Sequence, residues 1–439
     1  MLGYKSTRLN SMRKVVSNSG TGVPPGGFGS VDYIKITIFG FALAALWGSL
    51  HTIVLQVRLL DFGFTGPEKT FWLGLLTLAG LVVAMVVQPI AGAISDRSSF
   101  SWGRRRPYIL LGTLLAMLFL PGIGFSGSFG ALLIIYCLLQ ASTNIAQGPY
   151  QGFIPDLVPG QRRGLGSGVK TLLEFVGGIA LVWLVFYFMD RYVTEQGGHW
   201  LWLLLAMLAI LLLGAMVATV VTVKERPGGG SSQLPLLPSL YKSFKIDVKA
   251  SPDFIRFLVS RLLILMAFAT LQRYALFFLM DVIGIANPLT VRNDLLIVVG
   301  ICMLAGAYPA GRLSDRLGRR PIVVSSGLLG ALGIVVLFFS PSYGYLMFAG
   351  ALLGISSGAF MSANWALATD LLPKGEEARY LGLTNLATAG SGALVGLMGL
   401  VIYLFNVNIP GMGYQVMLGA CFIYFVVGSL LLLKIKGRS

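Results

Sequence analysis

Few residues of this chain could do chemistry, and the most unusual of them is Glu174. Of 17 acidic residues it is the one that lies deep inside an apolar run, and Lys170, four positions earlier, would share its helix face. A carboxylate inside a membrane-spanning helix is costly, so Glu174 is a candidate to carry a proton or to bind a substrate. The alternative is a Lys–Glu pair that only holds its helix in place, and the sequence leaves both roles open.

Neutral polar side chains lie in other apolar runs and could recognise an uncharged solute. Asn144 and Gln147 are three residues apart on one helix face, where amides either bind between helices or line a cavity. His51 could titrate near neutral pH, but a lone histidine is more often a hydrogen-bonded core group. Arg261 and Arg273 are expected to extend toward opposite membrane surfaces, as long basic side chains do. The further cavity candidates are Gln272, Arg273, Asn364, Asn385 and Trp365, whose ring could stack on a sugar or simply pack.

A turn rich in charge occurs twice between apolar runs. Its charged positions are Asp96, Arg97, Arg104, Arg105 and Arg106 in the first copy, and Asp315, Arg316, Arg319 and Arg320 in the second. These residues could form solvated loops that set topology, or a latch that closes one side of the protein in one state. In the latch, Asp96 would pair with Arg162 or Arg163 of a neighbouring loop, or sit at a helix N-terminus.

Two further aspartates occupy matching positions in the two halves of the chain. Asp156 stands in Ile154-Pro155-Asp156-Leu157-Val158-Pro159, and Asp370 in Ala368-Thr369-Asp370-Leu371-Leu372-Pro373. This repetition favours a shared structural role such as capping the following loop. Asp370 and Arg379 belong with the gating residues.

The composition is that of a membrane protein. The chain is 56% hydrophobic and only 11% charged, with a mean hydropathy of +0.80. The net charge of +16 would suggest nucleic acid in a soluble protein, but the basic residues lie in short loops, where they set topology. Nucleic acid is therefore not an expected partner. The three cysteines lie in apolar runs without metal-ligand spacing.

Runs of about 20 apolar residues predict twelve membrane-spanning helices. They lie at 34–58, 71–93, 107–126, 129–155, 164–189, 200–223, 254–282, 294–313, 321–340, 343–369, 379–405 and 415–434. Residues 1–33 read as a disordered basic tail, 224–253 as a linker that separates bundles 34–223 and 254–434, and 435–439 as a short tail.

Charge places both termini in the cytoplasm. The loops and tails on their side carry about 24 Lys and Arg, against about four on the other side: Arg58, Lys69, Arg191 and Arg292. The second half also repeats the first in register. Pro107 to Asp156 and Pro321 to Asp370 are both intervals of 49 residues, and parallel six-helix repeats are a transporter architecture with substrate held between the halves.

The duplicated Gly-x-x-Ser-Asp-Arg…Gly-Arg-Arg turn resembles the signature loop of the major facilitator superfamily. The long first copy, Asp96 to Pro107, and Asn144-Ile145-Ala146-Gln147-Gly148-Pro149 resemble the sucrose transporter and glycoside-pentoside-hexuronide:cation symporter branch. The resemblance implies secondary sugar transport, with proton coupling at Asp156. The arginine that plant sucrose transporters carry shortly before this position is replaced by Tyr150 and Gln151.

These observations predict an all-α secondary transporter of a neutral sugar or glycoside, coupled to protons, working as a monomer in lipid. The expected location is a bacterial inner membrane. A carrier of lipophilic molecules and a transporter-like receptor are the alternatives. No phosphate-binding loop or catalytic constellation occurs, so neither an enzyme nor a cofactor or metal is expected.

Overall fold

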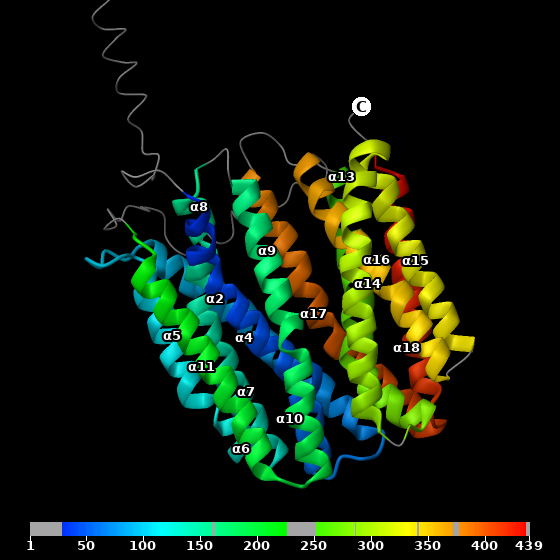
Figure 1. Ribbon diagram of the computed structural model, residues 1–439. Coiled ribbons are helices and arrows are strands. Elements are labelled where there is room, and N and C mark those ends of the chain that lie inside the picture. Colours follow the sequence, from blue (N-terminus) through cyan, green and yellow to red (C-terminus); the bar gives the residue numbers. More distant parts are fainter. Residues whose placement is uncertain are drawn as a thin grey trace, which may run out of the picture.

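The computed structural model describes residues 29–159, 163–225, 252–285, 287–339, 342–371 and 377–435. Every regular element within these ranges is a helix, and twelve spans are long and apolar enough to cross a membrane. Helices suit these apolar runs because they satisfy all backbone polar groups internally, as lipid requires. The predicted all-α fold with twelve spans is confirmed, and Figure 1 shows the helices side by side in two groups.

The first group, here called the first half, contains six spans. Its helices are α2 (Ser30–Ser49), η1 (Leu50–Val54), α3 (Leu55–Asp61), α4 (Glu68–Asp96), α5 (Arg106–Phe119), α6 (Gly122–Phe125), α7 (Phe129–Gln151), α8 (Phe153–Leu157), α9 (Arg163–Ala180), α10 (Val182–Thr194) and α11 (Gly198–Thr222). The third span is interrupted near Pro121, which begins the short α6 as its N-cap.

The second half contains the other six spans. Its helices are α13 (Pro252–Phe278), η3 (Leu279–Ile283), α14 (Pro288–Leu317), α15 (Arg319–Phe339), α16 (Tyr343–Asp370), α17 (Glu377–Asn408) and α18 (Met412–Leu433). The eighth span begins at Pro288, six residues before the predicted 294, because its polar first turns are helical too. Most of the predicted tail and linker, residues 1–28, 226–251 and 436–439, lies outside the described residues.

Both charged turns lie at one end of the protein. This end, here called the turn end, holds Asp96, Asp156, Arg319 and Asp370 and lies at the top of Figure 1; the far end holds Asp61, Thr194, Ile283 and Asn408. Every hydrogen bond and ion pair that the structure gives between described residues of opposite halves lies in the far part of the spans.

Glycines bring the two halves into backbone contact near the far end, where α4 crosses α17. A Cβ added at Gly74 would lie 2.3 Å from the carbonyl oxygen of Gly396, and one at Gly399 would lie 2.2 Å from that of Thr70. Side chains at these positions would therefore push the helices apart. Small residues are what allow transmembrane backbones to approach so closely.

Replacing Gly399 by Val should hold the halves apart at the far end, because the new side chain would meet the backbone of α4 at Thr70 and Gly74. Gly392→Val on the same helix is the matched control, because a Cβ there meets nothing within 4 Å. Disulfide cross-linking between cysteines placed on α4 and α17 near the far end measures the approach. Equal cross-linking in both variants would contradict the close contact.

Candidate functional site

Arg105 is the centre of a charged network at the turn end. Its side chain is buried, and its Nη2 and Nε donate to Asp96 at 2.8 Å and to Asp156 at 2.5 Å. Arg104 adds a second ion pair to Asp156, at 2.6 Å. Gly152 leaves the space for this guanidinium, since a Cβ there would lie 1.9 Å from Cζ of Arg105. The network ties the end of α4 to α5 and α8 within one half.

Glu225, just after α11, adds a further carboxylate to this network. Its carboxylate accepts a hydrogen bond of 2.9 Å from the backbone N–H of Arg105, and it packs where a side chain at Gly103 would stand. Gly103 has φ +124°, a conformation that favours glycine. Burial raises the pKa of Glu225 above its ordinary value, although the N–H donor and the nearby arginines act in the opposite direction.

The second half repeats only part of this network. Arg319 pairs with Asp370 and donates to the carbonyl of Ala366 at 2.6 Å, as Arg105 does with Asp156 and Pro149. Arg320 donates to the carbonyls of Leu433 and Ile435. Asp315 and Arg316 are exposed, and Asp315 has no ion pair among the described residues.

The structure gives Asp96 a partner in its own turn, Arg105. The expected pairing of Asp96 with Arg162 or Arg163 stays a prediction. Arg162 and the side chains of Arg163 and Arg379 lie outside the described residues. Arg97 is half-buried at the end of α4. Asp156 is held by two arginines of the turn, which fits the structural alternative for this residue.

The far end is joined across the halves by a buried ion pair. Lys69 of α4, 2% exposed, contacts Asp281 of η3 at 2.5 Å, and Tyr414 of α18 donates to the second oxygen of Asp281 at 2.6 Å. Three spans from both halves thus share one carboxylate. Separating the halves here would leave Lys69 with the carbonyl oxygen of Thr65, at 3.2 Å, as its hydrogen-bond acceptor. Losing the carboxylate that neutralises a buried ammonium is costly.

A second set of contacts joins α3 to α13 and α14. Gln56 donates to the carbonyl of Arg273 at 2.7 Å and accepts from Arg292, whose Nη2 donates to the carbonyl of Gln272 at 2.8 Å. Arg273 donates to Thr77 of α4 at 3.0 Å. Arg292, expected in an outer loop, is instead 1% exposed inside α14. The side chain of Gln272 is exposed.

A row of polar groups follows one face of α7. Tyr136, Gln140 and Asn144 lie four residues apart: Gln140 donates to the Tyr136 hydroxyl at 3.0 Å, and Asn144 donates to Gln140 at 3.1 Å. His51 shares a hydrogen bond of 2.8 Å with the same hydroxyl and stacks on Trp47. Asn144 is buried and Gln147 half-buried, and the hydrogen bonds given for Asn144 stay within its own helix. A shared role of the two amides, between helices or lining a cavity, stays a prediction.

Glu174 lies on α9 against α2 and α7. Its carboxylate is 3.6 Å from Lys170 and 35% of its side chain is exposed, so the expected i,i+4 pair forms without closing off the acid. A Cβ at Gly40 would lie 2.7 Å from its Oε1 and 2.3 Å from the Tyr150 hydroxyl. Lys170 also lies over the Tyr150 ring, at 5.3 Å.

Arg261 of α13 forms the corresponding cluster in the second half. It donates to Asn364 of α16 and to Thr388 of α17, at 3.1 to 3.2 Å for Thr388, and its guanidinium lies 5.8 Å from the ring centre of Trp365. The expectation that Arg261 reaches the membrane surface is wrong, since it is only 6% exposed. The side chain of Asn385 lies outside the described residues.

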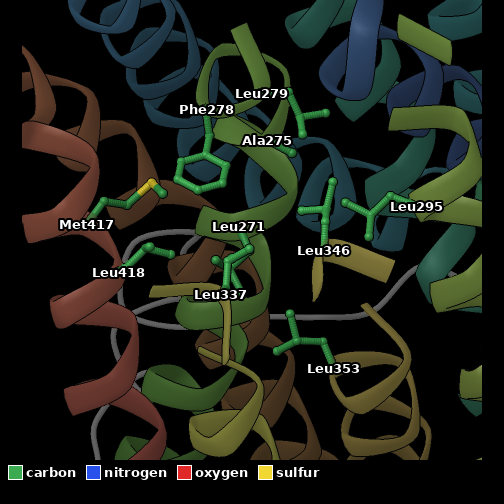
Figure 2. Close-up of a pocket in the computed structure, with 10 residues that line it drawn as sticks. All are labelled: Leu271, Ala275, Phe278, Leu279, Leu295, Leu337, Leu346, Leu353, Met417 and Leu418. Atoms are coloured by element: carbon green, nitrogen blue, oxygen red, sulfur yellow. The ribbon is translucent and has the colours of Figure 1, made fainter. Parts of the chain in front are cut away.

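A small apolar cavity lies within the second half. It has a volume of about 60 Å³ and is lined by side chains from α13, η3, α14, α15, α16 and α18, which point toward one another in Figure 2. Ligand sites are typically several hundred Å³ with a few polar groups. Because this cavity lies inside one half, it does not support the alternative of a lipophilic solute carried between the halves.

Sequence reasoning did not identify Arg292, Tyr136, Lys69 or Asp281 as contact residues. Arg292 and Lys69 stand out in the sequence as two of the few basic residues on the sparsely charged side, but the sequence predicts that both lie in loops. Tyr136 could have been found from its spacing of four to Gln140 and eight to Asn144.

Replacing Arg105 by Gln should destabilise the protein by about 1–3 kcal/mol, because two carboxylates lose the donor that compensates them. Arg106→Gln, whose guanidinium donates to the exposed carbonyl of Trp102, is the control. Thermal unfolding in detergent measures the difference. Equal unfolding temperatures for both variants would show that Arg105 does not hold the turn.

Replacing Glu225 by Gln should flatten the dependence of stability on pH. Because burial raises the pKa of Glu225, the folded protein binds its proton to a higher pH than the unfolded chain does. The contribution of this group to stability therefore falls as pH rises from the ordinary carboxyl range through the raised pKa. Unfolding temperatures of both proteins across weakly acidic pH test this, with parallel curves as the contrary result.

Sequence comparison relates this chain to known transporters. A sequence model of the family described as MFS/sugar transport protein matches residues 69–434. Sucrose transport protein SUT1 of Oryza sativa subsp. japonica is 30% identical over 189 residues, 36% of this chain and 35% of that protein. The minor myo-inositol transporter IolF of Bacillus subtilis (strain 168) is 34% identical over 98 residues, 22% of each. The chain spans only about a third of the length of the rice relatives.

Solved structures share the fold over nearly the whole chain. The D-xylose-proton symporter has a TM-score of 0.68 at 15% identity, covering 92% of this chain and 97% of that one. The nucleoside transporter NupG has a TM-score of 0.66 at 14% identity, covering 92% and 100%. The relatives and the fold are those of transporters, not enzymes. With the family match over residues 69–434, this multi-pass membrane chain belongs to the MFS/sugar transport protein family of the major facilitator superfamily.

Proposed function

We propose that the protein is a secondary transporter of a sugar or glycoside that works by alternating access. The observation that carries this proposal is the one-sided closure: the hydrogen bonds and ion pairs between described residues of opposite halves lie in the far part of the spans. Rocking of two six-helix repeats around a central site would break these contacts and close the turn end instead. Related transporters named for sucrose, myo-inositol and D-xylose support a sugar as the solute.

The turn end is cytoplasmic in this proposal. The excess of Lys and Arg in the loops of that end supports it. The state described here is then open toward the cytoplasm and closed toward the outside. The relatives come from rice and mouse as well as from Bacillus subtilis. Location in a bacterial inner membrane therefore stays a prediction from the sequence.

Glu174 is the proposed proton carrier. Its carboxylate lies inside a span, is about one-third exposed and is only loosely held by Lys170 at 3.6 Å. Asp156, the other candidate, is held by Arg104 and Arg105 at the turn end. A carboxylate that exchanges protons must be accessible to solvent and must not be held in a permanent ion pair. Glu174 is more exposed and less tightly paired than Asp156.

Uptake into liposomes with an imposed pH gradient tests this function. Purified protein should accumulate at least one labelled neutral sugar among sucrose, D-xylose and myo-inositol, and dissipating the gradient should stop accumulation. Failure to move any of the three, or accumulation that is independent of pH, would reject proton-coupled transport of these sugars.

Replacing Glu174 by Gln should abolish accumulation driven by the pH gradient and preserve exchange of labelled for unlabelled solute. Exchange does not require net proton movement, so this split separates a coupling role from a purely structural one. Glu195→Gln is the matched control, because Glu195 is an exposed acid at the far end paired with Arg191. Normal accumulation by the Glu174 variant would reject the assignment.

A further inference from the structure

The charged turn of the first half contains two exposed aromatic side chains. Phe100 is 47% exposed and Trp102 is 38% exposed. Both lie in residues 97–105, here called the aromatic loop, which connects α4 to α5. The matching turn of the second half is five residues shorter, since a single glycine separates α14 from α15, and it contains no aromatic residue. The extra length and both aromatic side chains therefore belong to the first half alone.

Contacts with α5 hold the aromatic loop in one shape. Ser98 Oγ shares a hydrogen bond of 2.6 Å with the hydroxyl of Tyr108, whose ring meets the ring of Phe100 edge-on. Arg106 donates to the carbonyl of Trp102 at 2.8 Å, and its guanidinium lies 5.6 Å from the centre of the indole ring. Both aromatic side chains are thus supported from one side and exposed on the other. A surface that is already ordered loses little conformational entropy when it binds.

The aromatic loop lies at the level where two apolar spans end. The helix before it ends at Asp96, and the helix after it begins at Arg106. In Figure 1 this light-blue segment extends sideways from the helices near the turn end and does not continue along their axes. Its aromatic side chains are therefore placed near the boundary between lipid and water, where tryptophan is enriched in membrane proteins.

The charge around the aromatic loop is positive. No acidic residue occurs between Asp96 and Asp156, whereas this interval holds four arginines: Arg97, Arg104, Arg105 and Arg106. Arg104 and Arg105 pair with the two aspartates. Arg106 donates to a carbonyl and forms no ion pair with a carboxylate of the described residues. A guanidinium beside an exposed indole can bind a phosphate group through its N–H donors.

We propose that the aromatic loop docks on anionic phospholipid headgroups of the leaflet at the turn end. Phe100 and Trp102 enter the boundary between headgroups and acyl chains, and Arg106 binds the headgroup phosphate. Apolar insertion combined with basic residues is how surface segments bind anionic membranes. The proposal goes beyond the proposed function, because it does not depend on which solute is carried. Since the loop leads directly into Arg105, docking would steady the charged network of the first half only.

A spin label inside the loop tests the docking. The label is attached to Ser101→Cys, an exposed position between the two aromatic residues, after the three native cysteines are replaced by alanine. The protein is placed in nanodiscs of phosphatidylcholine, with and without phosphatidylglycerol. Adding phosphatidylglycerol should raise the accessibility of the label to oxygen, which concentrates in the bilayer, and lower its accessibility to a water-soluble nickel chelate.

A label at Leu317→Cys is the matched control, because Leu317 is exposed at the end of α14 in the turn without aromatic residues. Its accessibility should change little with lipid charge. High accessibility of the loop label to the nickel chelate in both kinds of nanodisc would overturn the proposal and indicate a soluble partner for this surface. An equal response at both positions would also overturn it, since the effect would then not be specific to the aromatic loop.

Two variants separate the aromatic contribution from the charge. Replacing Phe100 and Trp102 together by Ser should leave the loop label in water in both nanodiscs. Arg106→Gln should increase by about fivefold the phosphatidylglycerol needed for half of the change, the effect of one basic residue near an anionic surface, and Arg106→Lys should retain most of the response. Thermal unfolding in detergent checks that each variant folds. An unchanged response after loss of both aromatic residues contradicts the proposal.

Discussion

The cost of burying charge inside a membrane protein is the constraint on which most of this structure depends. Lys69, Arg105 and Arg292 are almost fully buried, yet each has hydrogen-bond acceptors from other spans. These contacts hold helices together more specifically than apolar packing can, because lipid competes with apolar side chains but not with a paired charge. The arrangement of charge therefore decides which helices stay together and which can separate.

The charged contacts fall into two classes according to the halves they join. At the turn end, Arg105 with Asp156 and Arg319 with Asp370 each join helices of a single half. At the far end, Lys69 with Asp281 and Gln56 with Arg292 join the two halves. The first class preserves each half as a unit. The second class of contacts fixes how the two halves are oriented relative to each other. These contacts would break if the halves rocked against each other.

The glycine crossing of α4 and α17 works with the far-end contacts. Gly74, Gly396 and Gly399 bring the backbones close enough for Lys69 and Thr77, on the same helix α4, to reach α13 and η3. Close backbone approach and polar pairing thus support each other.

The duplication also gives the two halves different chemistry at equivalent places. Glycine at position 40 leaves room for Tyr150 and Glu174, whereas Arg261 fills the same place beside the smaller Asn364 and Thr388. One backbone repeat therefore carries an acid on one side and a base on the other. The equivalence of these places follows from offsets between the halves of 221 residues, from Asp32 to Asp253, and of 214 residues, from Asp156 to Asp370.

The sequence by itself determined the class, the number of spans and the repeat. Apolar runs of membrane length and the duplicated turn carry that information locally, because each span must satisfy its own backbone. It also identified Lys170–Glu174, since four residues on one helix fix their proximity. Only the tertiary structure decided that Arg105 pairs with Asp96, that Arg292 is buried against Gln56, and that Arg261 donates to Asn364 and Thr388. Those facts depend on how the turn folds and on which helices pack together, and neither leaves a periodic signal in the sequence.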